Sequence, residues 1–309
     1  MIDLKKITKG RIERAPRVLV YGPSAIGKTT FATGAPQPFV IDADKGSHKL
    51  DVQRVVPSDW NEAREWITAV ETGSVKCETL ILDSVTELEA MSYATIFNGE
   101  TVDKFGGGYG RGDTHAIQVW REVLSQLERI WMQGKAIVIV AHAIVKRFED
   151  PTLAAGYDRF EIAARPKLAQ LLQQAMDYSL FCREEIATLG KDAKNKAVST
   201  GIRSIYTRRC PAYDAKARGT TLFPEKIHMS WQDFSDAIKS DHTRIVTFTR
   251  EVDEMLKKLG DPALEKQVRD YVKSCPAGVS EAHNRLTAIL DEREREKSKA
   301  TATATGEAQ

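Results

Sequence analysis

The feature that most constrains the fold is a glycine-rich turn placed between an apolar strand and a helix. Residues 17–21 read RVLVY, and residues 22–29 read GPSAIGKT. The turn matches the pattern G-x-x-x-x-G-K-[ST] at every fixed position, and it follows a strand and opens a helix, as a phosphate-binding P-loop requires. The sequence therefore predicts a strand–loop–helix unit that holds the phosphates of a nucleotide.

Short apolar runs alternate with longer amphipathic segments across the first two thirds of the chain. This alternation is typical of an α/β fold with a parallel sheet, whose buried strands are apolar throughout. Two further segments, 203–209 and 213–222, are expected to add antiparallel strands at one edge. The predicted parallel strands are residues 17–21, 38–42, 79–83, 136–141 and 177–182.

The chain is expected to have four parts. Residues 1–16 form a basic N-terminal segment and residues 17–229 the α/β core. Residues 230–298 read as a small helical region, because helical patterns are separated there by Gly-Asp-Pro and Cys-Pro-Ala-Gly breaks. Residues 299–309 are small and polar, so we expect a disordered tail.

Composition excludes some classes of protein. The 45 Lys and Arg nearly balance the 43 Asp and Glu of the 309 residues, so attraction to nucleic acid has to come from local clusters of charge. The four cysteines form no C-x-x-C pair, which argues against a zinc site or a disulfide framework. No apolar run is long enough for a signal peptide or a membrane span, so we expect no membrane contact and a cytoplasmic location.

The P-loop motif predicts how phosphates and Mg²⁺ are bound. Successive backbone N–H groups face the phosphates, Lys28 reaches the β- and γ-phosphates, and the Thr29 hydroxyl takes a position on Mg²⁺. ATP and Mg²⁺ are the expected cofactors. The predicted nucleotide-binding residues are Gly22, Pro23, Ser24, Ala25, Ile26, Gly27, Lys28, Thr29 and Thr30.

A second metal ligand is expected at the tip of a neighbouring strand. Residues 79–83 read TLILD, so Asp83 fits the Walker B position and would share Mg²⁺ with Thr29. The alternative interpretation is that Asp83 is the N-cap of the next helix. Ser84 follows it, where AAA+ machines usually carry Glu, and this favours another class of P-loop protein.

The order of these motifs resembles a known family. The P-loop is followed by a strand ending in IDADKG (41–46), by the strand ending Asp83-Ser84, by VIVAH (138–142) and by a later K-x-R. This order resembles a RecA-type core. It is most similar to the minimal RecA-like ATPases that bacteriophages encode beside their recombination genes, a group counted among single-strand annealing proteins. The resemblance covers residues 15–228.

The resemblance implies further catalytic residues. In RecA-like and DnaB-like ATPases, a carboxylate after the second strand activates the attacking water, and Asp44 matches that position with Asp42 as its rival. A turn-capping role for either Asp stays open. A polar residue at the end of the strand after Walker B senses the γ-phosphate, which makes His142 the candidate here. Its alternative is a hydrogen-bonded core histidine.

Two loops are candidate DNA contacts. The loop after His142 matches the second DNA-binding loop of RecA-like proteins, and Lys146, Arg147 and Arg159 suit the backbone of single-stranded DNA. The glycine-rich stretch 104–112 contributes Tyr109 and Arg111 to a first DNA-contacting or subunit-contacting loop. A solvated loop and a mobile connector are the respective alternatives.

Residues 191–218 hold the strongest local excess of positive charge. Lys216 and Arg218 match a K-x-R-x-G that related RecA-fold ATPases carry on a strand reaching the neighbouring subunit's nucleotide, where the cations neutralise charge on the γ-phosphoryl group. The resemblance therefore implies self-association into rings or filaments. Charge that protects an edge strand is the alternative interpretation.

We therefore expect a DNA-dependent ATPase that assembles on single-stranded DNA and promotes annealing or strand pairing in phage homologous recombination, in the host cytoplasm. A DnaB-like helicase or helicase-loader subunit is the first alternative, and a P-loop kinase of a small metabolite is the second. The C-terminal helices are candidates for binding a single-strand-binding protein.

Overall fold

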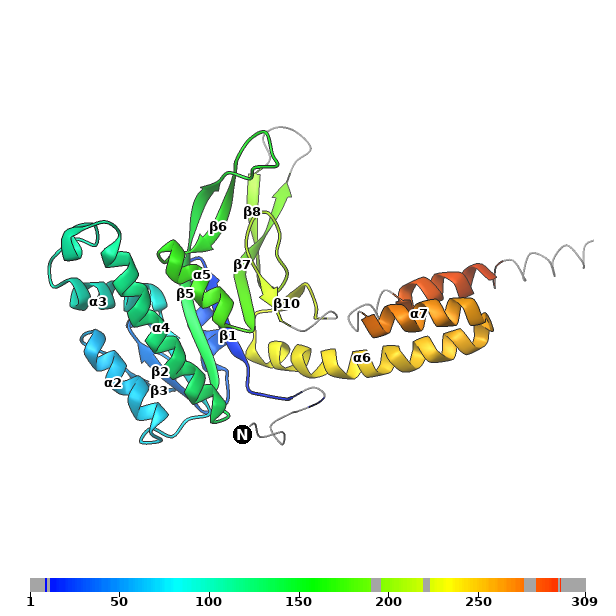
Figure 1. Cartoon of the computed structure of the whole chain (residues 1–309), viewed down its shortest axis with the longest axis horizontal. Helices are drawn as coiled ribbons and strands as arrows, with labels where there is room; N and C mark the ends of the chain where they lie inside the picture. The colour runs from blue at the N-terminus through cyan, green and yellow to red at the C-terminus, as the bar shows by residue number, and fades with distance from the viewer. Residues whose placement is uncertain are drawn as a thin grey trace, which may run out of the picture. The chain divides into compact units, whose positions relative to one another are not determined.

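The computed structural model describes residue 9 and residues 12–189, 196–218, 223–274, 282–293 and 295 (Figure 1). The chain divides into two compact units. The first comprises residues 1–218 and 225–232, and the second comprises residues 219–224 and 233–309. The predicted tail, residues 299–309, lies outside the described residues, as does most of the predicted segment 1–16.

The first unit is built on one ten-stranded sheet, counted over the described residues. Its main path runs β10-β8-β7-β1-β5-β4-β2-β3, while β6 pairs with β5 and β9 with β7. The strands are β1 (Arg17–Gly22), β2 (Pro38–Asp42), β3 (Gln53–Val55), β4 (Thr79–Asp83), β5 (Ala136–Phe148), β6 (Tyr157–Ile162), β7 (Tyr178–Leu189), β8 (Lys196–Tyr206), β9 (Lys216–Ala217) and β10 (Lys226–His228).

The centre of the sheet is parallel and its margins are antiparallel. Every pairing from β3 to β7 along the main path is parallel. Strands β6, β8, β9 and β10 pair antiparallel with their neighbours. The predicted class, an α/β fold with a mainly parallel sheet flanked by helices and a C-terminal helical region, is confirmed.

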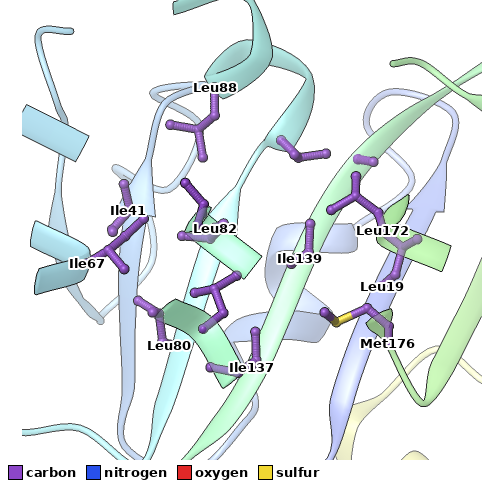
Figure 2. Close-up of a cluster of buried hydrophobic side chains, with 14 of the residues drawn as sticks. Leu19, Ile41, Ile67, Leu80, Leu82, Leu88, Ile137, Ile139, Leu172 and Met176 are labelled. Carbon is purple, nitrogen blue, oxygen red and sulfur yellow. The ribbon is translucent and has the colours of Figure 1, made fainter. Parts of the chain in front are cut away.

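The sheet is sandwiched by helices because its strands are apolar on both faces. Alternate side chains of β1, β2, β4 and β5 enter a large buried cluster with residues of the covering helices. Figure 2 shows Leu80 and Leu82 of β4 beside Ile137 and Ile139 of β5 in this cluster. The covering helices are α2 (Trp60–Glu71), α3 (Val85–Phe97), α4 (Arg111–Met132) and α5 (Pro166–Ala175).

The intervening strand residues are buried toward the opposite face. Val20 and Val140 have almost no exposed surface, and the short helix α1 (Lys28–Thr33) contacts this part of the sheet with Phe31 and Ala32. A parallel sheet covered on both sides leaves ligands access at the ends of its strands.

The strand predictions are confirmed at the centre of the sheet and only in part at its margin. All five predicted parallel strands are present. Of the predicted antiparallel strand 203–209, residues 203–206 form the end of β8, which pairs antiparallel with β7. The described part of the predicted strand 213–222 forms only the two-residue β9, also antiparallel to β7. Strand β5 also continues past its predicted end at residue 141 and forms a hairpin with β6, in register from Ala143↔Ile162 to Phe148↔Tyr157.

The second unit is helical. It contains most of α6 (Trp231–Leu259), all of α7 (Pro262–Ser274) and a helix at residues 282–293. Its small core includes Val252, Leu256 and Leu286. Asp261 caps α7, since its Oδ1 accepts hydrogen bonds from the backbone N–H groups of Ala263 and Leu264 at 3.0 and 3.1 Å.

The helices were also compared with the length and hydropathy that a membrane span requires. Among the helices of the described residues, none combines sufficient length with sufficient apolar character to cross a membrane.

Candidate active site

Polar residues meet at the carboxyl ends of the parallel strands. The sheet register pairs Gly22 of β1 with His142 of β5 and pairs Asp42 of β2 with Asp83 of β4. Because neighbouring parallel strands point the same way, residues far apart in sequence arrive at one edge. This edge holds the candidate site.

Two glycines allow the turn after β1 to form. A Cβ placed on Gly22 would lie 2.3 Å from the carbonyl oxygen of Cys182 on β7, so no larger residue fits there. Gly27 is the N-cap of α1 with φ 108° and ψ 20°, a conformation that L side chains rarely adopt. The spacing of the motif thus has a direct structural cause.

Lys28 folds back across this turn. Its Nζ donates hydrogen bonds to the carbonyl oxygens of Gly22 at 3.0 Å and Pro23 at 2.8 Å. The residue is 5% exposed, and burial lowers the pKa of its ammonium group. The ammonium group therefore lies over the loop, where a P-loop lysine meets the phosphates.

Thr29 and Asp83 form a hydrogen-bonded pair of oxygen-bearing side chains. The Thr29 hydroxyl donates to Asp83 Oδ2 at 2.6 Å. Asp83 is 1% exposed, and desolvation raises its pKa to about 6, against the lowering effect of the Thr29 hydrogen bond. A hydroxyl and a carboxylate side by side are hard oxygen donors of the kind that Mg²⁺ prefers, so the residues fit this metal.

Asp83 is not the N-cap of α3, which was the alternative interpretation of this residue. The N-cap of α3 is Ser84, whose Oγ accepts a hydrogen bond from the backbone N–H of Glu87 at 3.4 Å. Asp83 is therefore left to face Thr29.

Asp44 and His142 are joined to each other and to the phosphate loop. His142 Nε2 lies 2.8 Å from Asp44 Oδ2, and the Ser84 hydroxyl donates to Asp44 Oδ1 at 2.8 Å. On the other side of the imidazole ring, Nδ1 lies 3.4 Å from the Ser24 hydroxyl. One network thus connects the turn after β2, the junction between β4 and α3, the end of the parallel part of β5 and the P-loop.

Asp42 stabilises the turn after β2 and does not join this network. Its carboxylate accepts hydrogen bonds from the backbone N–H of Gly46 at 3.0 Å and from the N–H and hydroxyl of Ser47 at 2.9 and 2.6 Å. The residue is 1% exposed. Of the two rivals, Asp42 caps the turn and Asp44 faces the site.

Sequence reasoning did not connect two serines with this network. Ser24 was predicted as a nucleotide-binding residue and Ser84 was noted as the residue after Asp83, but neither was predicted to contact the Asp44–His142 pair. The available signal was the shared edge of the sheet. Ser24, Asp44 and Ser84 follow carboxyl ends of parallel strands, and His142 ends the parallel part of β5.

Lys216 and Arg218 lie at the other end of the strands. Lys216 pairs with Ser179 near the start of β7, and Lys216 Nζ donates to the carbonyl oxygen of Gln173. Arg218 donates to the carbonyl oxygen of Gln174 at 2.8 Å and lies 3.5 Å from Asp177. The structure therefore does not bring these cations to the P-loop of their own chain.

Four of the five predicted DNA contacts are exposed. Tyr109 is 99% exposed in the loop before α4, and Arg111 donates to the carbonyl oxygen of Gly106 at 2.7 Å. Lys146 and Arg147 lie on the exposed part of β5, with acidic neighbours at 3.7 Å.

Arg159 requires a correction. It is 4% exposed on β6, lies 2.6 Å from Asp214 and packs over the ring of Phe148 at 4.8 Å from its centroid. Asp214 is far away in sequence, so the loop pattern did not reveal this partner. A side chain held in this way is not available to a DNA backbone, and we remove it from the predicted interface.

The fold and this site define a P-loop ATPase. The chain belongs to the AAA_24 family, described as an AAA domain, whose family model matches residues 14–219. The family bears this description although Ser84 rather than Glu follows Asp83.

Structural comparisons add two similar proteins. The RadB recombinase aligns with a TM-score of 0.39 at 16% identity, over 71% of this chain and 90% of that one. The flagellar accessory protein FlaH from Methanocaldococcus jannaschii aligns with a TM-score of 0.32 at 10% identity, over 63% of this chain and 86% of that one. No curated protein matches the chain.

Proposed function

We propose that the protein is a RecA-type, ATP-hydrolysing protein that binds single-stranded DNA and promotes annealing or strand pairing in phage homologous recombination. One observation carries the proposal: β5 runs unbroken from the sheet through His142 to the exposed residues Lys146 and Arg147. A single strand therefore connects the phosphate site to two exposed cations.

Nucleotide binding is assigned to residues 22–30. Backbone N–H groups of the loop cradle the phosphates, and Lys28 adds a positive charge over them. Thr29 and Asp83 would hold Mg²⁺, which supplies neutralisation of phosphate charge when bound.

Hydrolysis is assigned to the Asp44–His142 pair. Asp44 orients the attacking water and accepts its proton, although its side chain is one methylene shorter than the Glu of related ATPases. The imidazole of His142 lies between Asp44 and the loop residue Ser24, so it is placed to respond when a γ-phosphate enters. A shift of His142 moves the start of the β5–β6 hairpin directly.

DNA binding is assigned to the exposed cations Lys146, Arg147 and Arg111 together with Tyr109. Cations follow the phosphate backbone, and the exposed tyrosine ring offers a stacking surface for bases. ATP would favour the DNA-bound assembly, and hydrolysis would release it.

Lys216 and Arg218 are assigned to the nucleotide of a neighbouring copy. Their position at the amino end of β7 excludes contact with the phosphates of the same chain. Hydrolysis would then depend on self-association into filaments or rings.

The direct test is binding of a labelled oligonucleotide by the full chain, with and without ATP and Mg²⁺. We expect ATP to strengthen binding to single-stranded DNA, and Lys28→Ala to remove this ATP effect. Single-strand affinity that does not respond to ATP would overturn the proposal. Closed hexamers that unwind a forked substrate would support the helicase alternative instead.

A further inference from the structure

A second cation of the same chain lies beside the P-loop. Arg203 is on β8, and its Nη1 is 3.3 Å from the position that a Cβ on Gly27 would occupy. Its side chain is exposed. The glycine therefore leaves open the space next to this guanidinium group, at the point where the loop turns into α1.

The fold holds Arg203 at this place from two sides. Across the β7–β8 pairing it faces Glu184, two residues after the Cys182 that packs against Gly22. On the other side, the backbone N–H of Met229 donates to the carbonyl oxygen of Arg203 at 3.2 Å. The methyl group of Met229 also lies 3.9 Å from the Cβ position of Gly27. The position of Arg203 is thus part of the sheet and not of a free loop.

Arg203 also differs from its basic neighbours in its charge partners. Arg208 lies 2.7 Å from Glu225, Arg209 lies 3.1 Å from Asp214, and Arg218 lies 3.5 Å from Asp177. Within the part of the chain that the structure describes, Arg203 has no carboxylate within ion-pair distance. A guanidinium group beside Gly27 of the P-loop, without an acidic partner, is placed for a ligand that carries negative charge.

The order of the strands indicates which phosphate of a bound nucleotide would lie near Arg203. Asp83, Asp44 and His142 approach the loop from the β5–β4–β2 side of β1, whereas Arg203 approaches from the β7–β8 side. The first group is assigned to the metal and the γ-phosphate, so Arg203 faces the opposite part of the loop. Loop N–H groups there cradle the α- and β-phosphates.

We propose that Arg203 binds the α- or β-phosphate of the nucleotide held by its own P-loop. This inference rests on the proposed nucleotide site and adds a contact made within one chain, distinct from the contact between chains assigned to Lys216 and Arg218. The guanidinium group offers paired N–H donors that suit phosphate oxygens.

The test measures the affinity of the full chain for ADP and for a slowly hydrolysed ATP analogue, by calorimetry without DNA. We expect Arg203→Ala to weaken the binding of both nucleotides by a similar factor, about tenfold or more, because a hydrogen bond to a charged group is lost. Arg203→Lys should recover part of the loss because it keeps the charge. The matched control is Arg121→Ala, an exposed arginine on α4, which should bind both nucleotides as the unaltered chain does.

Three outcomes separate the possibilities. Equal affinity of Arg203→Ala and the unaltered chain, with binding abolished in Lys28→Ala, overturns this inference alone. A loss of affinity for the ATP analogue alone also overturns this inference, because Arg203 would then contact the γ-phosphate. If the unaltered chain binds neither nucleotide, the proposed function fails together with this inference. Circular dichroism melting of each variant, with Arg203→Lys as the least disruptive one, separates lost binding from lost folding.

Discussion

The two ends of the sheet each carry a motif expected to act on phosphate, and they are built differently. At the carboxyl end, Lys28, Asp83 and His142 come from parallel strands or the loop after them. At the amino end, Lys216 belongs to the short antiparallel strand β9 beside β7, and Arg218 directly follows it. Strand β1 has six residues, so these ends are separated by about 16 Å at the usual rise per residue.

The groups at the two ends also have different partners. Asp44, His142, Thr29 and Asp83 hydrogen-bond mainly with one another around the P-loop. Lys216 and Arg218 are instead bonded to carbonyl oxygens at the end of α5. Two phosphate-related motifs in one chain, here the P-loop and the K-x-R at Lys216, therefore need not form one site. Parallel strands bring their ends together by geometry, whereas an antiparallel addition can place its residues at either end.

The largest expected effect is the loss of ATP hydrolysis when Lys28, at the carboxyl end of the sheet, is replaced. Lys28→Ala should reduce ATP hydrolysis on the order of 100-fold or more, because the ammonium group stabilises charge on the transferred phosphoryl group. Phosphate release under saturating ATP measures it. The melting temperature serves as the folding control, and activity close to that of the unaltered chain would contradict the assignment of the loop.

The second prediction concerns the pair behind the P-loop. Asp44→Ala and His142→Ala should each lower kcat about 10- to 100-fold while ATP affinity changes little, because the groups act on the water and not on binding. Since the two side chains are 2.8 Å apart, the double variant should lose much less than the product of the single losses.

Asp42→Asn provides the contrast for this pair. Asp42 accepts three hydrogen bonds from the turn at Gly46 and Ser47, so the substitution should lower the free energy of unfolding by about 1–3 kcal/mol. Denaturant unfolding measures it. A loss of kcat without a loss of stability would return Asp42 to the catalytic candidates.

The third prediction tests the separation of the two ends. The double variant Lys216→Ala, Arg218→Ala should bind ATP within about threefold of the unaltered chain, yet hydrolyse it at least about tenfold more slowly when assembled. Mixing it with Lys28→Ala should restore activity, because one chain then supplies the P-loop and the other supplies the cations. Absence of any recovery in mixtures would contradict the role across subunits.

The smallest expected effect concerns the hairpin. Arg147→Ala should weaken single-stranded DNA binding by only a few-fold and reduce its salt dependence, as loss of one phosphate contact does. Arg159→Ala should leave DNA affinity unchanged and lower the melting temperature by several degrees, because it removes a buried side chain and its pairing with Asp214. The opposite pattern would reverse the correction made for Arg159.

Prediction from sequence was strongest where local pattern and chemistry coincide. The five parallel strands were found because each is an apolar run that a doubly covered sheet requires. The P-loop and Asp83 were found because a phosphate site needs these residue types directly after such strands. The extension of β5 and its pairing with β6 were not found, since exposed residues such as Lys146 and Asp158 carry no strand signal.

The sequence by itself determined the α/β class, the glycines of the turn after β1 and the polar residues at the strand ends, because these depend on neighbouring residues and on strand burial. Only the tertiary structure showed that Asp42 caps the turn while Asp44 contacts His142, buried Arg159 against Asp214 and placed Arg203 beside Gly27. It also showed that Lys216 and Arg218 lie at the end of the strands opposite their own P-loop. These outcomes depend on which strands pair and in which direction, and such contacts join residues that are far apart in the chain.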